Sequence, residues 1–195
     1  ERAEGLRGDT LLLLEHAPVY TAGRRSLPEH VRATLQAALV ETDRGGQVTY
    51  HGPGQLVGYP ILALAEHGLG PKAYVRALEN ALVDALASFG VQGHREEGLT
   101  GVWTAYGKIA AIGVKIARGV TIHGFALNVS TDLSAYEAIV PCGIEGRPVT
   151  AMAQVLGQPP AMAAVRHAVV SALAARLGVR WADGPAHGAV TPAHR

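Results

Sequence analysis

Two segments show the helical spacing of apolar residues, with one apolar position every three or four. The first covers residues 72–89, follows Pro71 and stops at Gly90, and these two residue types are typical of a helix start and a helix end. The second covers residues 161–177 and precedes Gly178. The pattern therefore predicts two long amphipathic helices.

Short strand-like runs, rich in apolar and β-branched residues, account for most of the remaining pattern. They cover residues 10–15, 19–21, 56–64, 102–106, 109–117 and 120–129. The last two runs meet at Arg118-Gly119, a hairpin-turn signal. A weaker helical pattern covers residues 29–40, and residues 135–140 fit no single element. Strands outnumber helices and do not alternate with them, so we predict an α+β fold with a largely antiparallel or mixed sheet flanked by helices.

Composition supports one folded domain. The chain has 195 residues, of which 48% are apolar and 17% charged, so it can bury a core and is not disordered as a whole. We expect a single domain over residues 1–181. The end of the chain, residues 182–195, is rich in glycine, proline and alanine, and we expect a flexible tail there.

Charge and cysteine content limit the classes of partner and the compartment. The formal net charge is +1 and no block of like charges runs along the chain, so we expect no nucleic-acid partner. Apolar runs such as residues 11–14 are too short to span a bilayer, and we expect no membrane contact. A single cysteine cannot form an intramolecular disulfide, which favours a reducing, cytoplasmic location.

Cys142 lies between Pro141 and Gly143. A lone cysteine is usually a small buried apolar residue. However, a preceding proline and a following glycine are typical of a turn that presents the side chain. A thiol is mostly protonated at neutral pH because its reference pKa is about 8.5. A nucleophilic role for Cys142 would therefore need a base or a cation nearby.

Lys108 is the first candidate for that partner. In an unbulged strand it would share its face with four apolar residues, Ala110, Ile112, Val114 and Ile116. A lysine is ordinarily solvated, but one at the end of a buried face is desolvated and can exchange a proton near neutrality.

The position of Lys108 in the hairpin follows from the turn. A turn centred on Arg118 would place Lys108 opposite Asn128. The chain from Asn128 to Cys142 is then long enough to bring the thiol over Lys108. A β-bulge would change this pairing.

His51 and His123 are alternative partners for Cys142, and each precedes a glycine. A lone histidine in a strand is more often a structural residue than a catalytic one. Together with Cys142, the two histidines could form a zinc site. No C-x-x-C or H-x-x-x-H spacing supports such a site, so we expect no metal.

Glycine-rich segments indicate where a ligand could approach the backbone. The turn Arg44-Gly45-Gly46 lacks both the GxxxxGK[ST] phosphate loop and the GxGxxG dinucleotide fingerprint. Residues 111–113 and 124–126 are small and apolar, and the predicted hairpin places them opposite one another. These facing segments form either a closely packed sheet or an apolar groove, and a groove would suit a linear acyl chain.

Four segments, in this order, resemble the octanoyltransferase family of lipoate biosynthesis, also called lipoyl(octanoyl) transferases. They are RGGQVTYHGPGQ at 44–55, GKIAAIG at 107–113, HGFALN at 123–128 and PCG at 141–143. The resemblance spans roughly residues 10–178. Members usually carry about one more strand and helix before the segment at residue 11, so we expect this chain to be a trimmed or mis-started version.

The resemblance implies a fold similar to the catalytic domain of biotin and lipoate protein ligases. It implies transfer of an octanoyl group from acyl carrier protein to a lysine of lipoyl domains, in the E2 subunits of 2-oxoacid dehydrogenases and the glycine-cleavage H protein. This is the first step of endogenous protein lipoylation, and it needs no cofactor. By the same resemblance, Cys142 is the acyl-thioester nucleophile, and Lys108 favours its thiolate and shuttles protons.

The resemblance also implies a substrate pocket. Its expected residues are Arg44, Gly45, Gly46, Gln47, Val48, Thr49, Tyr50, His51, Ala111, Ile112, Gly113, His123, Gly124, Phe125 and Ala126. Because carrier proteins are acidic, Arg24, Arg25 or Arg147 could form the docking surface for the donor.

Three other functions remain open on sequence grounds. An ATP-dependent lipoate or biotin ligase of the same fold would need a nucleotide surface and no cysteine. A thiol hydrolase would use Cys142 with His51 or His123. A non-catalytic acyl-binding protein of the same fold would form no covalent adduct on Cys142.

Overall fold

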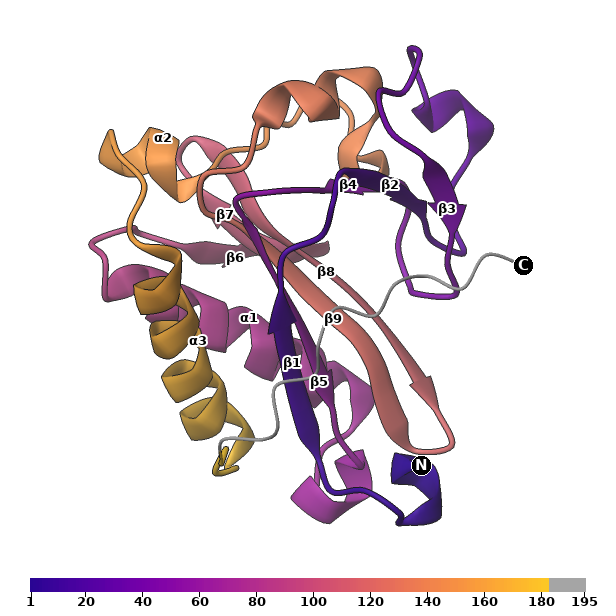
Figure 1. Ribbon diagram of the computed structural model, residues 1–195, viewed down its shortest axis with the longest axis vertical. Helices are drawn as coiled ribbons and strands as arrows, with labels where there is room; N and C mark the ends of the chain where they lie inside the picture. The colour runs from indigo at the N-terminus through magenta and orange to yellow at the C-terminus, as the bar shows by residue number, and fades with distance from the viewer. Residues whose placement is uncertain (183–195) are drawn as a thin grey trace.

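A six-stranded antiparallel sheet forms the centre of the computed structural model, which describes residues 1–182 (Figure 1). Its strand order is β1-β5-β9-β8-β7-β6, and every neighbouring pair is antiparallel. The strands are β1 (Thr10–Leu14), β5 (Gln55–Ile61), β6 (His94–Glu96), β7 (Leu99–Thr104), β8 (Gly107–Ala117) and β9 (Val120–Asn128). The prediction of a largely antiparallel sheet is therefore confirmed.

A second, smaller sheet packs near one end of the main sheet (Figure 1). Its order is β3-β2-β4, with β2 (Val19–Ala22) parallel to β3 (Leu39–Glu41) and antiparallel to β4 (Thr49–His51). Tyrosines from this sheet and from the segment before Cys142 form a separate small core, made of Tyr20, Tyr50 and Tyr136 with neighbouring apolar residues. This arrangement fixes β4 and the glycine-rich segment before it.

Helices α1 (Pro71–Ala87) and α3 (Met162–Leu177) pack together on one side of the main sheet (Figure 1). The helical spacing in the sequence is confirmed by burial, because Leu78, Leu82 and Leu86 of α1 are 0% exposed. Leu173 of α3 is equally buried. Each such leucine stabilises the fold by about 1.5–3 kcal/mol through removal of apolar surface from water. A short helix, α2 (Met152–Leu156), precedes α3.

The β8–β9 hairpin turns at Arg118 and Gly119, which have φ angles of 51° and 78°. Two consecutive left-handed residues form the tight turn that matches strand twist. The pairing runs from Ala117 with Val120 to Ala110 with Leu127. The predicted pairing of Lys108 with Asn128 is wrong. The two-residue turn shifts the register by one from a turn centred on Arg118, and the ladder ends at Ala110, so that Lys108 pairs with Trp103 and Val149 instead.

A β-bulge lies at the start of β8. Val102 pairs with Ala110 but Trp103 pairs with Lys108, so Ile109 has no partner on β7. Ile109 and Ala110 both belong to the core beneath the helices, whereas Lys108 lines a cavity to which neither α1 nor α3 contributes. The predicted face of Lys108 is therefore wrong, because the bulge interrupts the alternation of the strand. Its predicted burial is correct, since Lys108 is 6% exposed.

The weak helical pattern at residues 29–40 is also wrong. This segment forms a single 3₁₀ turn (Pro28–His30) and then enters β3. Its apolar residues Leu35 and Ala37 pack against the small tyrosine core instead of lining a helix. The ambiguous residues 135–140 lie largely within another 3₁₀ segment (Leu133–Ala138).

Two further predictions concern the extent of the chain. The predicted tail at 182–195 lies outside the described residues except for its first position, and the division of the chain at 181 stays a prediction. Within residues 1–182, no helix combines the length and apolar character that a bilayer crossing requires.

Candidate active site

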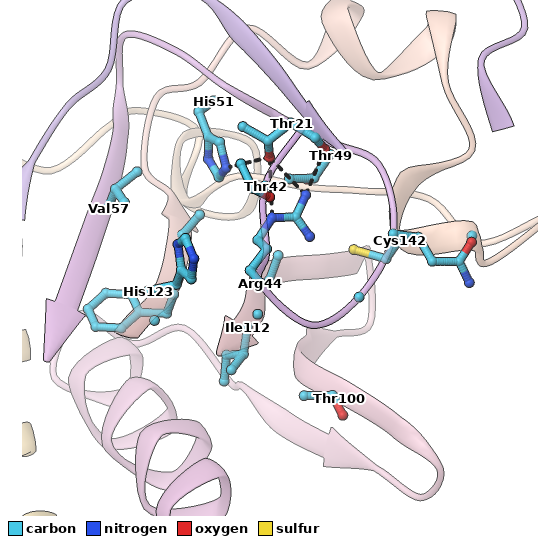
Figure 2. Close-up of a pocket in the computed structure, with 18 of the residues that line it drawn as sticks. Thr21, Thr42, Arg44, Thr49, His51, Val57, Thr100, Ile112, His123 and Cys142 are labelled. Carbon is cyan, nitrogen blue, oxygen red and sulfur yellow. Dashed lines mark hydrogen bonds between the residues drawn. The ribbon is translucent and has the colours of Figure 1, made fainter. Parts of the chain in front are cut away.

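A cavity of about 570 Å³ lies between the small sheet and the face of the main sheet turned away from α1 and α3 (Figure 2). Its volume falls in the range of small-molecule sites. Cys142, Lys108 and most residues of the predicted pocket line it. Gly45, Val48 and Tyr50 do not. Alternation in β4 explains Tyr50, because Thr49 and His51 line the cavity while Tyr50 packs in the tyrosine core.

Cys142 lies in a single 3₁₀ turn (Pro141–Gly143) at the cavity wall, and it has a left-handed φ of 56°. Its backbone N–H donates to Val48 O at 2.9 Å, which ties the turn to the segment before β4. A Cβ added at Gly143 would lie 2.0–2.3 Å from the Gln47 amide. The glycine after Cys142 is therefore required for this close approach, and the thiol is presented to the cavity.

Lys108 reaches the same cavity from the start of β8. Its Nζ lies 5.2 Å from the centre of the Trp103 ring, a cation–π distance. Its backbone N–H and C=O bond to Pro148 O and Thr150 N, each at 2.9 Å. Pro148 follows Cys142 by only six positions. These bonds therefore hold the chain that follows Cys142 beside Lys108.

Arg44 is a second buried cation in the cavity, with 8% exposure. Its Nη2 donates to Thr21 O at 2.7 Å and to Thr21 Oγ1 at 2.8 Å, and Nη1 donates to Gly45 O. No carboxylate forms an ion pair with it in the part of the chain that the structure describes. Burial lowers the pKa of Arg44, and the nearby Cys142 acts in the opposite direction.

Figure 2 shows the Cys142 sulfur directed toward the Arg44 guanidinium. An arginine remains protonated even when its pKa falls somewhat, because its ordinary value is far above neutrality. Arg44 therefore contributes a fixed positive charge to the region where the Cys142 thiol enters the cavity. A positive charge near a thiol favours the thiolate.

His51 is held as a neutral imidazole. Gln55 Nε2 donates to Tyr50 O, so Gln55 Oε1 faces His51 and accepts a hydrogen bond from its Nδ1 at 2.7 Å. The unprotonated Nε2 lies 3.3 Å from Thr21 Oγ1. Burial lowers the pKa of His51 to about 4, and the charge of Arg44 adds to this effect. At neutral pH His51 is thus a hydrogen-bond acceptor and not a cation.

His123 also lines the cavity, and its side chain contacts a carboxylate. Its φ of 63° is unusual for a non-glycine strand residue, and its Nε2 lies 2.7 Å from Asp43 Oδ1. Lys115 Nζ donates to Asp43 Oδ2 at 2.6 Å. These two contacts lower the pKa of Asp43 to about 2. They tie the residue before Arg44 to the β8–β9 hairpin.

A metal site was one of the hypotheses for His51, His123 and Cys142. Within residues 1–182, no three side chains of the metal-ligating types gather closely enough to hold an ion. His51 bonds Gln55 and His123 bonds Asp43 instead.

The two facing segments of the hairpin pair as predicted, with Ala111 opposite Ala126 and Gly113 opposite Gly124. The space beside the two glycines, however, is filled by the protein. A Cβ at Gly113 would lie 2.9 Å from Gly45 O, and one at Gly124 would lie 2.2 Å from Gly58 O. Close backbone packing therefore explains these glycines, and both segments still line the cavity.

Several residues around the site were not among the predicted site residues. Thr21 and Tyr59 line the cavity, and Asp43 anchors the glycine-rich segment. Gln55 and Asn128 are joined by a 2.9 Å hydrogen bond between β5 and β9. Gln55 and Asn128 are polar residues within buried strands, and this polarity was a signal of a structural or functional hydrogen bond. No local pattern indicated Thr21 or Tyr59.

The main sheet thus has helices on one side and, on the other, a cavity that holds a thiol and two cations. Comparison with protein families gives a result consistent with this arrangement. The family described as the lipoyl protein ligase A/B catalytic domain matches residues 1–174. The chain belongs to this family.

The relatives within the family are more specific. An octanoyltransferase of Chloroflexus aggregans is 52% identical over 92% of this chain and 86% of its own length. An octanoyltransferase of Geobacter metallireducens is 49% identical over 86% of this chain and 78% of its own length. The chain is thus an acyltransferase that transfers octanoyl groups in protein lipoylation.

Solved structures agree on the fold. A bi-partite lipoate protein ligase of Thermoplasma acidophilum has a TM-score of 0.73 at 18% identity, covering 90% of this chain and 74% of that chain. A biotin protein ligase of Aquifex aeolicus has a TM-score of 0.52 at 14% identity, covering 85% of this chain and 70% of that chain. The predicted similarity to the ligase catalytic domains is confirmed.

Proposed function

We propose that the chain takes its octanoyl group from an acyl carrier protein and passes it to a lysine of a lipoyl domain through a thioester on Cys142. The observation that carries the proposal is the meeting of one thiol and two buried cations, Lys108 and Arg44, in one cavity. The acceptors would be lipoyl domains of 2-oxoacid dehydrogenase E2 subunits and of the glycine-cleavage H protein, in the cytoplasm.

The first half-reaction is a thioester exchange. The Cys142 thiolate attacks the carbonyl carbon of the octanoyl thioester, and the carrier sulfur leaves and takes up a proton. The ammonium of Lys108 favours the attacking thiolate and can supply that proton. One thioester replaces another, so the step is nearly balanced in free energy and needs no ATP.

The three N–H groups of the Cys142 turn are already used inside the protein. Those of Cys142, Gly143 and Ile144 donate to Val48 O, Val140 O and Pro141 O. They are therefore not free to bind the oxyanion of the tetrahedral intermediate. We assign this role to the cationic side chains of Lys108 and Arg44, which lie in the same cavity.

The second half-reaction forms the amide. After giving up its proton, Lys108 is a neutral amine that can accept a proton from the ammonium of the incoming lysine. The resulting amine attacks the carbonyl carbon of the octanoyl thioester, the bond from that carbon to the Cys142 sulfur breaks, and the second proton of the amine passes to the departing sulfur. Conversion of a thioester to an amide is downhill, which drives the transfer.

The cavity wall suits the acyl chain. Val57, Ala111 and Ala126 present small apolar groups on the face of the main sheet that lines the cavity. An apolar wall with a few polar groups at one end is typical of sites for amphiphilic small molecules.

The docking surface for the carrier protein stays a proposal. Arg147 is engaged elsewhere, because it pairs with Glu96 and lies over the Trp103 ring. Arg24 and Arg25 are exposed, and Arg25 lines the cavity mouth. These two arginines are the better candidates to contact an acidic carrier.

Intact-protein mass spectrometry tests the proposed acyl-enzyme. Mixing the protein with octanoyl carrier protein, without acceptor, is expected to add the mass of one octanoyl group to the Cys142 peptide. The Cys142→Ala variant is expected to gain no mass and to transfer nothing to a lipoyl domain. Normal transfer by this variant would rule out the thioester route. Rapid loss of the adduct to water alone would instead indicate a thiol hydrolase.

A further inference from the structure

Glu79 is a buried carboxylate on α1 that the proposed reaction does not use. It is 7% exposed, and the other buried residues of α1 are apolar. Among residues 1–182, no lysine, arginine or histidine forms an ion pair with it. A buried carboxylate without a cation is costly unless it accepts strong hydrogen bonds. Its position therefore calls for a specific reason.

Among the residues that the structure describes, the Glu79 side chain accepts one hydrogen bond, and its donor lies on β7. Gly101 N–H donates to Glu79 Oε1 at 3.0 Å, and the contact is buried. A charged acceptor makes a stronger hydrogen bond than a neutral one. Glu79 thus fixes the backbone of β7 at Gly101.

Gly101 lies directly beneath the Lys108 side chain. A Cβ added at Gly101 would lie 2.6 Å from Lys108 Cε and 3.2 Å from Lys108 Nζ. Gly101 has a φ of +123°, a backbone conformation that residues other than glycine rarely adopt. The β-bulge begins at the next pair, where the partners of Val102 and Trp103 shift by one. The backbone that Glu79 holds is therefore the backbone that leaves room for the Lys108 ammonium.

We propose that Glu79 is a positioning residue for Lys108: by holding Gly101 in its left-handed conformation, it keeps the path of the lysine side chain to Cys142 open. The inference rests on the proposed role of Lys108. It adds that this role depends on a carboxylate on the far, helix-covered side of the sheet, which does not line the cavity.

The reactivity of the Cys142 thiol measures directly whether Lys108 is held in position. The chain has one cysteine, so the rate of alkylation by iodoacetamide measures the thiolate of Cys142 alone. The rate is measured from pH 5 to 10 on the full chain without substrate. As a reference, Lys108→Met is expected to slow alkylation at pH 7 about tenfold and to move the profile about one pH unit to the alkaline side.

Gly101→Ala is the first test variant. The added methyl group would displace Lys108 Cε, and the expected alkylation profile is that of Lys108→Met. Gly90→Ala is the matched control. Gly90 also has a positive φ, +79°, but an added Cβ meets nothing within 4 Å. The control is expected to lose stability and to keep the wild-type profile.

Glu79 itself is tested by a conservative and a disruptive substitution, which also decide the question if Gly101→Ala does not fold. Glu79→Gln keeps an acceptor oxygen for Gly101 N–H and is expected to keep the wild-type profile. Glu79→Leu removes the acceptor and is expected to show the alkaline shift. Asp84→Leu is the control on the same helix, because it breaks the ion pair with Arg176 on α3, and among residues 1–182 no hydrogen bond or ion pair joins the Asp84 side chain to β7.

The outcomes separate the two proposals. If Lys108→Met leaves the profile unchanged, the proposed role of Lys108 is wrong. If Lys108→Met shifts the profile but Glu79→Leu lowers stability without shifting it, Glu79 is only structural and the inference is overturned. A shift in Glu79→Leu that is restored in Glu79→Gln, with none in Asp84→Leu, supports it.

Discussion

At the scale of single residues, burial determines which groups carry charge. Arg44 stays cationic in the cavity because its ordinary pKa lies far above neutrality, even though burial lowers it. His51 sits in the same wall and is neutral, because burial and the charge of Arg44 act on a pKa that starts near neutrality. The same environment therefore yields one fixed cation and one neutral acceptor.

The buried His51 predicts an acid-sensitive fold. In the unfolded chain a histidine titrates near pH 6.5, whereas in the folded chain the pKa of His51 is about 4. Between these values only the unfolded state binds the proton, so the free energy of unfolding falls as the pH is lowered from 6.5 toward 4. At pH 5 the expected loss relative to pH 7 is about 2 kcal/mol.

Urea unfolding at several pH values measures this loss. His51→Gln removes the titrating group and is expected to make stability less dependent on pH in this window. His16, whose pKa burial also lowers, keeps its own smaller contribution in both proteins. Equal slopes for the two proteins would show that His51 is not buried as a neutral imidazole.

At the scale of elements, the site is assembled by contacts between segments that are far apart in the sequence. The glycine-rich segment 44–46 is tied to β8 by Gly45 N–H, which donates to Val114 O at 3.0 Å. Asp43 adds its contacts with Lys115 and His123. The hairpin thus supports the segment that places Arg44 against the cavity.

Asp43→Asn tests this support. The amide keeps a hydrogen-bond acceptor but loses the charge that both Lys115 and His123 contact. Because Asp43 does not line the cavity, we expect KM for octanoyl carrier protein to rise about threefold with little change in kcat. Steady-state kinetics of octanoyl transfer measure both constants. Asp84→Asn, on the far helix, is the control, and a loss confined to kcat in Asp43→Asn would contradict this function of the residue.

At the scale of the whole molecule, the two faces of the main sheet have separate functions. Helices α1 and α3 supply the apolar core on one face, and the cavity lies on the other. Stability and substrate binding should therefore respond to different substitutions, except where a residue such as Glu79 connects the two faces.

Leu173→Ala tests this separation. Leu173 lies on α3, is 0% exposed and packs in the main core. Its truncation is expected to lower the free energy of unfolding by about 2–5 kcal/mol. The folded fraction should keep the wild-type KM, because no α3 residue lines the cavity. Urea unfolding measures the loss of stability, and steady-state kinetics measure KM. Leu156→Ala, at a more exposed leucine, is the control. A large rise in KM for Leu173→Ala would refute the separation.

Local sequence determined the elements whose signals are short-range. Helix α1 follows from its leucine spacing after Pro71, and helix α3 from its valine and leucine spacing before Gly178. The β8–β9 hairpin follows from Arg118-Gly119 and the flanking runs. The four motifs were enough to indicate the octanoyltransferase family, because each keeps residue types that a backbone turn or a reacting group requires.

The tertiary structure decided which way the key side chains point. Alternation in an unbulged strand placed Lys108 on the helix-covered face, but the bulge against β7 turns it into the cavity. A bulge depends on how two strands pair, and no local pattern in either strand reports that pairing. The partners of Glu79 and Arg44, and the filling of the space beside Gly113, likewise depend on contacts between distant segments. The sequence by itself determined the chemistry that is available and the local elements, whereas packing between elements decided which groups meet.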